Sequence, residues 1–242
     1  MDDLQRQMAE AVRFFWDTRS RQQLKQETSG RQDQGSRGAV TGGSQLDGFI
    51  GLVSEILVKC GIPQRTIFRK KRVDLPGYFR PTKEWDLLVV VDGELLASIE
   101  FKSQVGPSFG NNFNNRTEEA MGTATDLWTA YREGAFKEST RPWLGYFMLL
   151  EEAPGSVSPV KCSESHFPVF PEFRGASYAQ RYEIFCRKLM RERLYDASCL
   201  ILSERATGIQ GQYREPARDL DFAAFLASLT AKAGGYLKFR RK

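Results

Sequence analysis

The chain has 242 residues, of which 41% are hydrophobic and 27% are charged, a balance typical of globular proteins. It contains no apolar run as long as a membrane span, and its N-terminus lacks the apolar core of a signal peptide. We therefore expect one cytoplasmic domain over residues 1–242. The four cysteines are scattered and His166 is the only histidine, which argues against a zinc site, a disulfide framework or a Ser-His-Asp triad.

Residues 3–27 are predicted to form the first helix, because apolar side chains recur there at spacings of three and four. Residues 28–44 then form a polar, glycine-rich loop without the Gly-Lys-Ser/Thr of a phosphate-binding Walker loop. This loop is either a flexible linker or a segment that lies against DNA. In the second case Arg31 and Arg37 would contact phosphates or bases, and the glycines would let the backbone approach closely.

A second helix is predicted over residues 45–60, with apolar residues along one side. A basic cluster of Arg69, Lys70, Lys71 and Arg72 follows it, and Arg80 and Lys83 come soon after. The net charge of +5 alone only weakly favours an anionic partner. The local clusters suit phosphate contacts, which position a duplex without reading its sequence, although a solvated basic loop is the alternative.

Residues 83–104 are predicted to form two apolar strands joined by a tight turn at Asp92-Gly93. Asp86 opens the first strand, and Glu100 and Lys102 close the second. Strands that are apolar on both sides are usually buried on both faces, and a buried charge is costly unless it is paired or binds a metal. The hairpin therefore carries two carboxylates and an ammonium at the edge of a buried sheet.

The register of this hairpin decides whether the two carboxylates meet. A two-residue turn would place Asp86 opposite Ile99, on the wrong face. A three-residue loop would pair Val91 with Leu95 and place Asp86 opposite Glu100, and we prefer it for that reason. Alternatively, Asp86 lies just outside the regular ladder and bends inward.

Two carboxylates and a lysine at one point suit magnesium-dependent hydrolysis of a phosphodiester. Magnesium prefers oxygen ligands, activates water and neutralises the charge that develops on phosphorus. A neighbouring lysine can orient the water or add charge stabilisation. The alternative is the solvated end of an edge strand, where Glu100 and Lys102 form a weak ion pair.

The remaining elements are predicted in the order loop, helix, strand, loop, helix, strand and helix. The loop over residues 104–116 is rich in Gly and Asn, and a helix follows with Thr117 as its N-cap. The later elements are a strand over 143–150, a loop over 153–175, a helix over 178–195, a strand over 198–203 and a helix over 221–233 that ends at Gly234-Gly235. This order predicts an α/β fold with a mixed central β-sheet flanked by helices.

Four segments together resemble the XhoI-type family of type II restriction endonucleases, which belongs to the PD-(D/E)xK nucleases. The segments are residues 38–49, 84–86, 99–104 and 109–116. The resemblance covers nearly the whole chain and implies a restriction-endonuclease-like fold. It also implies a magnesium-dependent enzyme that acts as a homodimer on palindromic double-stranded DNA.

The resemblance implies roles for the residues of the hairpin. Asp86, Glu100 and the carbonyl of Phe101 would bind Mg²⁺, and Lys102 would position or activate the attacking water. In many such nucleases an acid on the preceding helix also helps to hold that water. Asp47 and Glu55 are the candidates here, and Glu55 is preferred because it sits among residues expected to face the core.

The family that the chain resembles recognises CTCGAG and cuts after the first C, which leaves 5′ overhangs with 5′-phosphates. The resemblance also implies a partner methyltransferase that protects the host DNA. DNA contacts are expected in the loops 28–44, 104–116 and 153–175 and in the basic cluster. The candidate residues are Arg31, Arg37, Thr41, Gly42, Gly43, Lys70, Lys71, Arg72, Ser103, Gln104, Asn111, Asn112, Asn114, Asn115 and Arg116.

Two other functions fit the same residues. One is a repair or junction nuclease of the same superfamily, and the other is a non-catalytic DNA-binding protein with a decayed site. The chain departs from the broad motif at Trp85, where a proline often stands before the first acid. The position of Asp86 relative to Glu100 is therefore the feature that a structure must establish.

Overall fold

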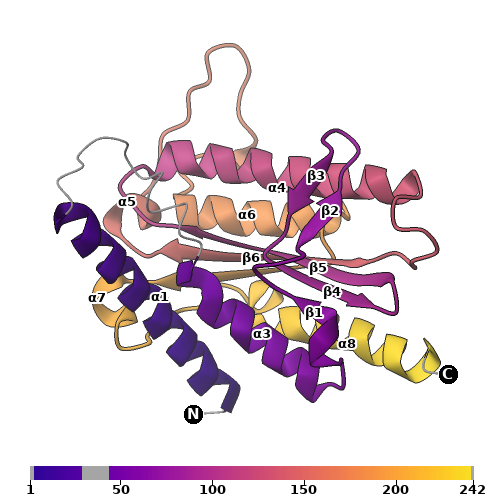
Figure 1. Cartoon of the computed structure of the whole chain (residues 1–242). Helices are drawn as coiled ribbons and strands as arrows, with labels where there is room; N and C mark the ends of the chain where they lie inside the picture. The colour runs from indigo at the N-terminus through magenta and orange to yellow at the C-terminus, as the bar shows by residue number, and fades with distance from the viewer. Residues whose placement is uncertain (1–2, 29–43, 241–242) are drawn as a thin grey trace.

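A computed structural model describes residues 3–28 and 44–240. Its centre is a five-stranded sheet in the order β1-β4-β5-β6-β7, with helices on both faces (Figure 1). The strands are β1 (Ile67–Phe68), β4 (Leu87–Val91), β5 (Glu94–Gln104), β6 (Trp143–Glu151) and β7 (Ala197–Ser203). Strand β4 is antiparallel to both of its neighbours, whereas β5, β6 and β7 run parallel. The predicted α/β fold with a mixed sheet is confirmed.

The two faces of the sheet are covered by different helices (Figure 1). Helices α1 (Asp3–Thr28), α3 (Asp47–Lys59) and α8 (Phe222–Arg240) cover one face, and α4 (Phe109–Arg132) and α6 (Tyr178–Arg191) cover the other. The short elements are η1 (Ser44–Leu46), η2 (Gln64–Thr66), β2 (Asp74–Pro76), β3 (Thr82–Glu84), α5 (Pro154–Val157), η3 (Pro171–Phe173), α7 (Arg205–Gly208) and η4 (Arg218–Leu220). Within the described residues, no helix is long and apolar enough to cross a membrane.

The turn between β4 and β5 has two residues rather than three. Asp92 and Gly93 adopt φ values of 52° and 83°, as a type I′ turn requires. Val91 accordingly pairs with Glu94 and not with Leu95. The predicted three-residue loop is wrong, because Asp followed by Gly tolerates the two left-handed positions that the tighter turn needs.

A β-bulge gives the register that the three-residue loop was predicted to give, with Asp86 opposite Glu100. Leu96 is an extra residue in β5, so that beyond it Leu87 pairs with Ile99. Asp86 lies one residue before β4 begins, as the alternative prediction had it. Continuing the register by one residue places Asp86 opposite Glu100, on the face of the sheet that α4 covers.

Helix α4 begins at Phe109, well before the predicted start at Thr117. The hydroxyl of Thr117 donates to the carbonyl of Phe113 inside the helix, at 2.5 Å, instead of capping its end. The asparagines of the predicted loop 104–116 are therefore helical. Phe109 and Phe113 explain this, because both are buried in the core beneath α4 and packing outweighs the turn preference of asparagine.

Helix α8 continues past the predicted stop at Gly234-Gly235 and ends at Arg240. Tyr236 and Leu237 pack against the core beyond the two glycines. Two glycines inside a helix cost about 1 kcal/mol each relative to alanine. The burial of an apolar residue on the next turn offsets that cost, so the helix persists.

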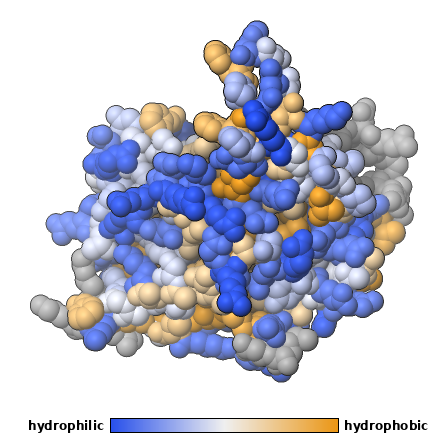
Figure 2. All heavy atoms as spheres, turned by 180° about the vertical axis from the view of Figure 1, so that it is seen from behind, coloured by the Kyte–Doolittle hydropathy of each residue, from blue (hydrophilic) through white to orange (hydrophobic). Residues whose placement is uncertain are grey.

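The predicted loop 153–175 contains α5 and η3, and its middle projects from the molecule (Figure 1). Phe167 and Phe170 are exposed there, at 84% and 72% of their surface. Figure 2 shows the molecule from behind, where apolar and hydrophilic side chains alternate along the projecting segment.

Candidate active site

A cleft of about 540 Å³ opens where β5 reaches its carboxyl end, between α4 on one side and α1 with η1 on the other. Asp86, Glu100 and Lys102 all line it, together with Phe101. The structure thus brings together the three charged residues of the predicted hairpin site. Further charged and polar residues of the lining are Arg19, Gln45, Arg80, Lys83, Ser103, Gln104, Ser108, Asn112, Arg116, Glu119 and Thr123.

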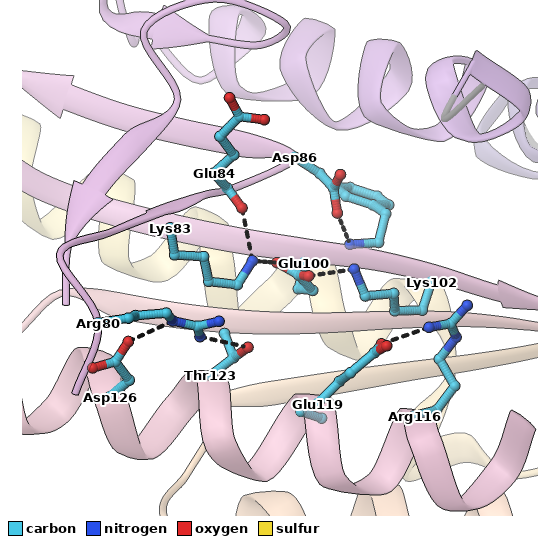
Figure 3. Close-up of polar contacts among 12 residues, drawn as sticks. Arg80, Lys83, Glu84, Asp86, Glu100, Lys102, Arg116, Glu119, Thr123 and Asp126 are labelled. Atoms are coloured by element: carbon cyan, nitrogen blue, oxygen red, sulfur yellow. Dashed lines mark hydrogen bonds and ion pairs between the residues drawn. The ribbon is translucent and has the colours of Figure 1, made fainter. Parts of the chain in front are cut away.

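Glu100 is the central anion of the cleft, and only 4% of its surface is exposed. Its two carboxylate oxygens contact different lysines (Figure 3). Lys102 contacts Oε1, and the Nζ of Lys83 lies 2.8 Å from Oε2. Lys83 also donates to the carbonyl oxygen of Glu84 at 2.7 Å. A buried carboxylate is thereby paired on both oxygens, as its burial demands.

These contacts keep the central ion pairs charged. Burial by itself would raise the pKa of Glu100, but Lys102 and Lys83 outweigh it and hold that pKa below its usual value. Burial would lower the pKa of Lys102, but Glu100 and Asp86 raise it above its usual value. Lys102 is therefore an ammonium at neutral pH, a donor of hydrogen bonds and positive charge.

Asp86 is the group of the site that titrates near neutral pH. Burial, and then the negative charge of Glu100, raise the pKa of Asp86 from 3.8 to about 6. Lys102, the backbone N–H of Phe101 and Lys83 oppose this rise. The Phe101 N–H donates to Oδ2 of Asp86 at 2.7 Å, which fixes the carboxylate beside that peptide group.

The oxygen atoms of this site fit a magnesium ion. Asp86 and Glu100 supply carboxylates to the cleft, and the Phe101 backbone lies against Asp86, which accepts its N–H. The Phe101 side chain is anchored on the opposite face of the sheet, where its ring lies 5.2 Å from that of Phe147. In the described part of the chain no group of three or more His, Cys, Asp or Glu residues could hold a metal. A cation here would need the two acids together with backbone oxygen and water, which is the arrangement that Mg²⁺ favours.

One face of α4 forms the wall of the cleft opposite α1. Asn112, Arg116, Glu119 and Thr123 succeed one another at spacings of three and four, so they share that face. Arg116 pairs with Glu119 at 2.5 Å (Figure 3). Among the described residues, the buried Nε of Arg116 has no hydrogen-bond partner. Arg116 therefore has one buried donor without an acceptor, while its side chain as a whole lines the cleft.

Comparison with known proteins then identifies the family. The model of the restriction endonuclease XhoI family matches residues 25–215. The type II restriction enzyme BstVI of Geobacillus stearothermophilus is 56% identical over 211 residues, which are 85% of this chain and 94% of that protein. The chain belongs to the XhoI restriction endonuclease family. No solved structure matches it significantly.

Two further relatives carry the same description. The type II restriction enzyme XhoI of Xanthomonas vasicola is 49% identical over 74% of this chain and 72% of that protein. The type II restriction enzyme AbrI of Azospirillum brasilense is 53% identical over 68% of this chain and 74% of that protein. The resemblance inferred from the four segments is thus confirmed. The family is one of sequence-specific deoxyribonucleases, which decides against the repair nuclease and the non-catalytic binder.

Several residues predicted to contact DNA do not line the cleft of this XhoI-family protein. Asn111, Asn114 and Asn115 lie on the exposed side of α4, whereas Asn112 and Arg116 face the cleft. The amide of Gln104 is committed to the fold: it donates to the Phe109 carbonyl at 2.8 Å and accepts from the Tyr182 hydroxyl. Gln104 does line the cleft, but both ends of its amide are bound within the protein, so its predicted contact with DNA stays a prediction.

The basic cluster also lies outside the cleft. Lys70 pairs with Asp47 at 2.7 Å, the Arg72 guanidinium lies 4.8 Å from the centre of the Phe68 ring, and Lys71 is exposed. The second half of the same basic stretch does reach the cleft, through Arg80 and Lys83. Arg31, Arg37, Thr41, Gly42 and Gly43 lie outside the described residues.

The structure does not bring Glu55 to the cleft. It is exposed on α3 and borders a groove with residues of α1, including Gln7 and Glu10. The expectation that Glu55 faces the core is wrong, because the apolar stripe of α3 turns its neighbours Leu52, Val53 and Ser54 inward instead. Gln45 and Leu46, just before α3, line the cleft instead.

Lys83 and Arg19 are two cleft cations for which the sequence predicts no role in the active site. In the sequence Lys83 is one of several cations upstream of Asp86. Arg19 carried no signal, because it lies in the polar half of α1 and reaches the cleft only through the tertiary fold. Burial, and then the nearby Arg205, lower the pKa of Arg19, while Glu151 opposes that shift.

Proposed function

We propose that this protein is a magnesium-dependent type II restriction endonuclease that cleaves CTCGAG after the first C in double-stranded DNA. The observation that carries the proposal is that Asp86, Glu100 and Lys102 line one cleft, with Lys102 paired to Glu100. Family membership supports the endonuclease activity, and the sequence CTCGAG comes from the family that the chain resembles.

Asp86, Glu100 and the Phe101 carbonyl would hold Mg²⁺, which supplies an activated water and neutralises charge on the scissile phosphate. Lys102 is held as an ammonium, so it orients the attacking water and stabilises the phosphate charge rather than removing a proton. Arg116 and Asn112, on the α4 wall, would bind phosphate oxygens and fix the strand for in-line attack. The products would be a 5′-phosphate and a 3′-hydroxyl.

The proposed site is palindromic, and a two-fold symmetric protein matches that symmetry. This supports a homodimer in which each subunit cuts one strand. The two apolar cores share one central sheet, which supports a single domain over residues 1–242. The segments 28–44, 104–116 and 153–175 and the basic residues Lys70, Lys71 and Arg72 are proposed to contact DNA. Such an enzyme requires a methyltransferase of the same specificity in its host cytoplasm.

The test is digestion of a long duplex of known sequence, with Mg²⁺ and with EDTA, beside the Lys102→Ala variant. We expect discrete fragments that need Mg²⁺, have the ends left by cleavage of CTCGAG after its first C and vanish in the variant, while the variant still binds the duplex. Sedimentation of the protein with a CTCGAG oligonucleotide tests the dimer. Fragments with other ends would overturn the recognition sequence, and cleavage that persists in Lys102→Ala would overturn the catalytic assignment.

A further inference from the structure

The turn of the β2–β3 hairpin, residues 77–81, presents two aromatic rings to solvent. Tyr78 and Phe79 are 56% and 70% exposed. Their rings contact each other edge to face, with centroids 5.5 Å apart and planes at 83°. An isolated exposed apolar residue needs no explanation, but two adjacent rings on a projecting turn favour a contact with another molecule.

The backbone beneath these rings is fixed by a buried carboxylate of α4. Asp126 is 4% exposed, and its Oδ1 accepts the N–H groups of Tyr78 at 2.7 Å and Phe79 at 2.8 Å. Its Oδ2 accepts Nε of Arg80 at 2.7 Å (Figure 3). A Cβ on Gly77 would lie 2.4 Å from that same Oδ2, so the close approach needs glycine. The turn is therefore pre-organised, with its rings turned away from the support.

The aromatic turn stands at the edge of the active-site cleft. Arg80 and Thr123 line both the cleft and a neighbouring hollow of about 300 Å³, which Phe79 and Asp126 also line. The same hairpin carries Lys83, which binds Glu100 on the cleft floor. One short hairpin thus connects the buried catalytic carboxylate to the exposed ring pair, and Arg80 lies between them.

We propose that Tyr78 and Phe79 form an aromatic wedge that stacks against, or enters between, bases of the duplex beside the cleaved phosphate. The proposal rests on the proposed function, because it assumes that DNA lies in the cleft. Every base offers a π face to an aromatic ring, and apolar side chains inserted at a base step can unstack it. Because Asp126 holds the turn in place before binding, little ordering is needed when DNA arrives.

The experiment uses a duplex with 2-aminopurine at successive positions in and beside CTCGAG. The protein carries Lys102→Ala, so that the duplex stays intact. Binding is expected to raise the fluorescence at one position, because a wedge unstacks that base. Adding Tyr78→Ala and Phe79→Ala should remove the increase and weaken binding about tenfold or more, as the loss of about 1–3 kcal/mol of stacking per base predicts. Phe79→Trp should restore both signals.

Phe239→Ala is the matched control, since Phe239 is 77% exposed but lies on α8, across the sheet from α4. Equal fluorescence and equal affinity in the Tyr78→Ala, Phe79→Ala variant and this control would overturn the wedge. Loss of the dimer in the wedge variant would also overturn it and make the turn a subunit contact. If the wild-type protein neither binds nor cuts CTCGAG, the proposed function is refuted. If Tyr78→Ala, Phe79→Ala with native Lys102 cuts CTCGAG as fast as the wild type, the wedge alone is refuted.

Discussion

Lys83 and Glu100 come from different hairpins and form a nearly buried ion pair, with side chains that are 15% and 5% exposed. The Lys83 ammonium also lies 4.7 Å from the centre of the Trp85 ring. Trp85 occupies the position where the broad nuclease motif often has proline, and it is buried at 3% exposure. The departure from the motif thus supplies a cation–π platform for a second lysine that pairs with Glu100.

Lys83→Met should destabilise the metal-free protein by about 1–3 kcal/mol, because Glu100 loses one of two counter-ions in a buried site. The same change frees Oε2 of Glu100 for a divalent ion. We therefore expect Mg²⁺ to raise the melting temperature of Lys83→Met more than that of the wild type. Lys83→Arg keeps the charge and serves as the control. Equal shifts in all three proteins would show that Lys83 does not compete with the metal.

Asp86→Asn should stabilise the folded protein at pH 8 while abolishing cleavage. The folded pKa of Asp86, about 6, exceeds its usual 3.8, so the wild type loses stability as pH rises between these values. Two pKa units correspond to about 3 kcal/mol, and we expect a gain of about 1–3 kcal/mol at pH 8. The gain should shrink between pH 6 and pH 4. Urea unfolding at pH 8, 6 and 4 measures it, and a variant less stable than the wild type at pH 8 contradicts it.

Asp126→Ala should loosen the aromatic turn and cost about 2–4 kcal/mol, because it leaves two backbone N–H groups and the Arg80 guanidinium without their acceptor. Asp126→Asn keeps one oxygen for the N–H groups and should lose less. Limited proteolysis should cut the Ala variant within residues 77–81 sooner than the wild type. Identical cleavage patterns would show that the turn does not depend on this carboxylate.

Gln104→Leu should lower stability by about 1–3 kcal/mol without altering which sequences are cut, because its amide bonds to Phe109 and Tyr182 in the core. Tyr182→Phe removes one of these bonds and should show a smaller loss. Thermal melting gives the stability, and digestion of a library of single-base variants of CTCGAG gives the specificity. If Gln104→Leu cuts a wider set of sequences than the wild type, Gln104 takes part in base recognition.

Glu55→Ala should cut DNA at the wild-type rate, because Glu55 is exposed on α3 and does not line the cleft. Glu100→Ala is the positive control for loss of activity. Single-turnover rates measured over a range of Mg²⁺ concentrations compare the two. A rate for Glu55→Ala that falls toward that of Glu100→Ala would place this acid in the reaction.

The sequence predicted that Asp86, Glu100 and Lys102 meet at one end of the hairpin, because a buried apolar strand pair leaves few explanations for charges there, but it predicted the wrong turn. It predicted the helix and strand order for the same reason, since apolar periodicity reflects burial. It misplaced the ends of α4 and α8, where local signals for a turn or a stop compete with packing. Thr117 and Gly234 carry such signals, and buried aromatic and apolar neighbours override them.

The rest of the site depends on tertiary proximity that no local pattern records. Arg19 reaches the cleft from the first helix, and Asp126 supports a hairpin far upstream in the sequence. The basic cluster looked like one feature, yet the fold sends Lys83 into the cleft and Lys70 to a pair with Asp47 outside it. Charge alone predicts an anionic partner but not which cations will face it.

The extra residue at Leu96 sets the phase of the whole hairpin. If Leu96 paired in a regular ladder instead of standing as the extra residue of the bulge, the two-residue turn would carry Asp86 to the opposite side of the sheet from Glu100, although every side chain of the site would still be present in the sequence. The assembly of the active centre therefore depends on a local irregularity in an apolar strand, some distance from the chemistry. Loss of the bulge with Leu96 retained would be as damaging as the loss of a carboxylate, whereas deletion of Leu96 together with the bulge would leave Asp86 opposite Glu100.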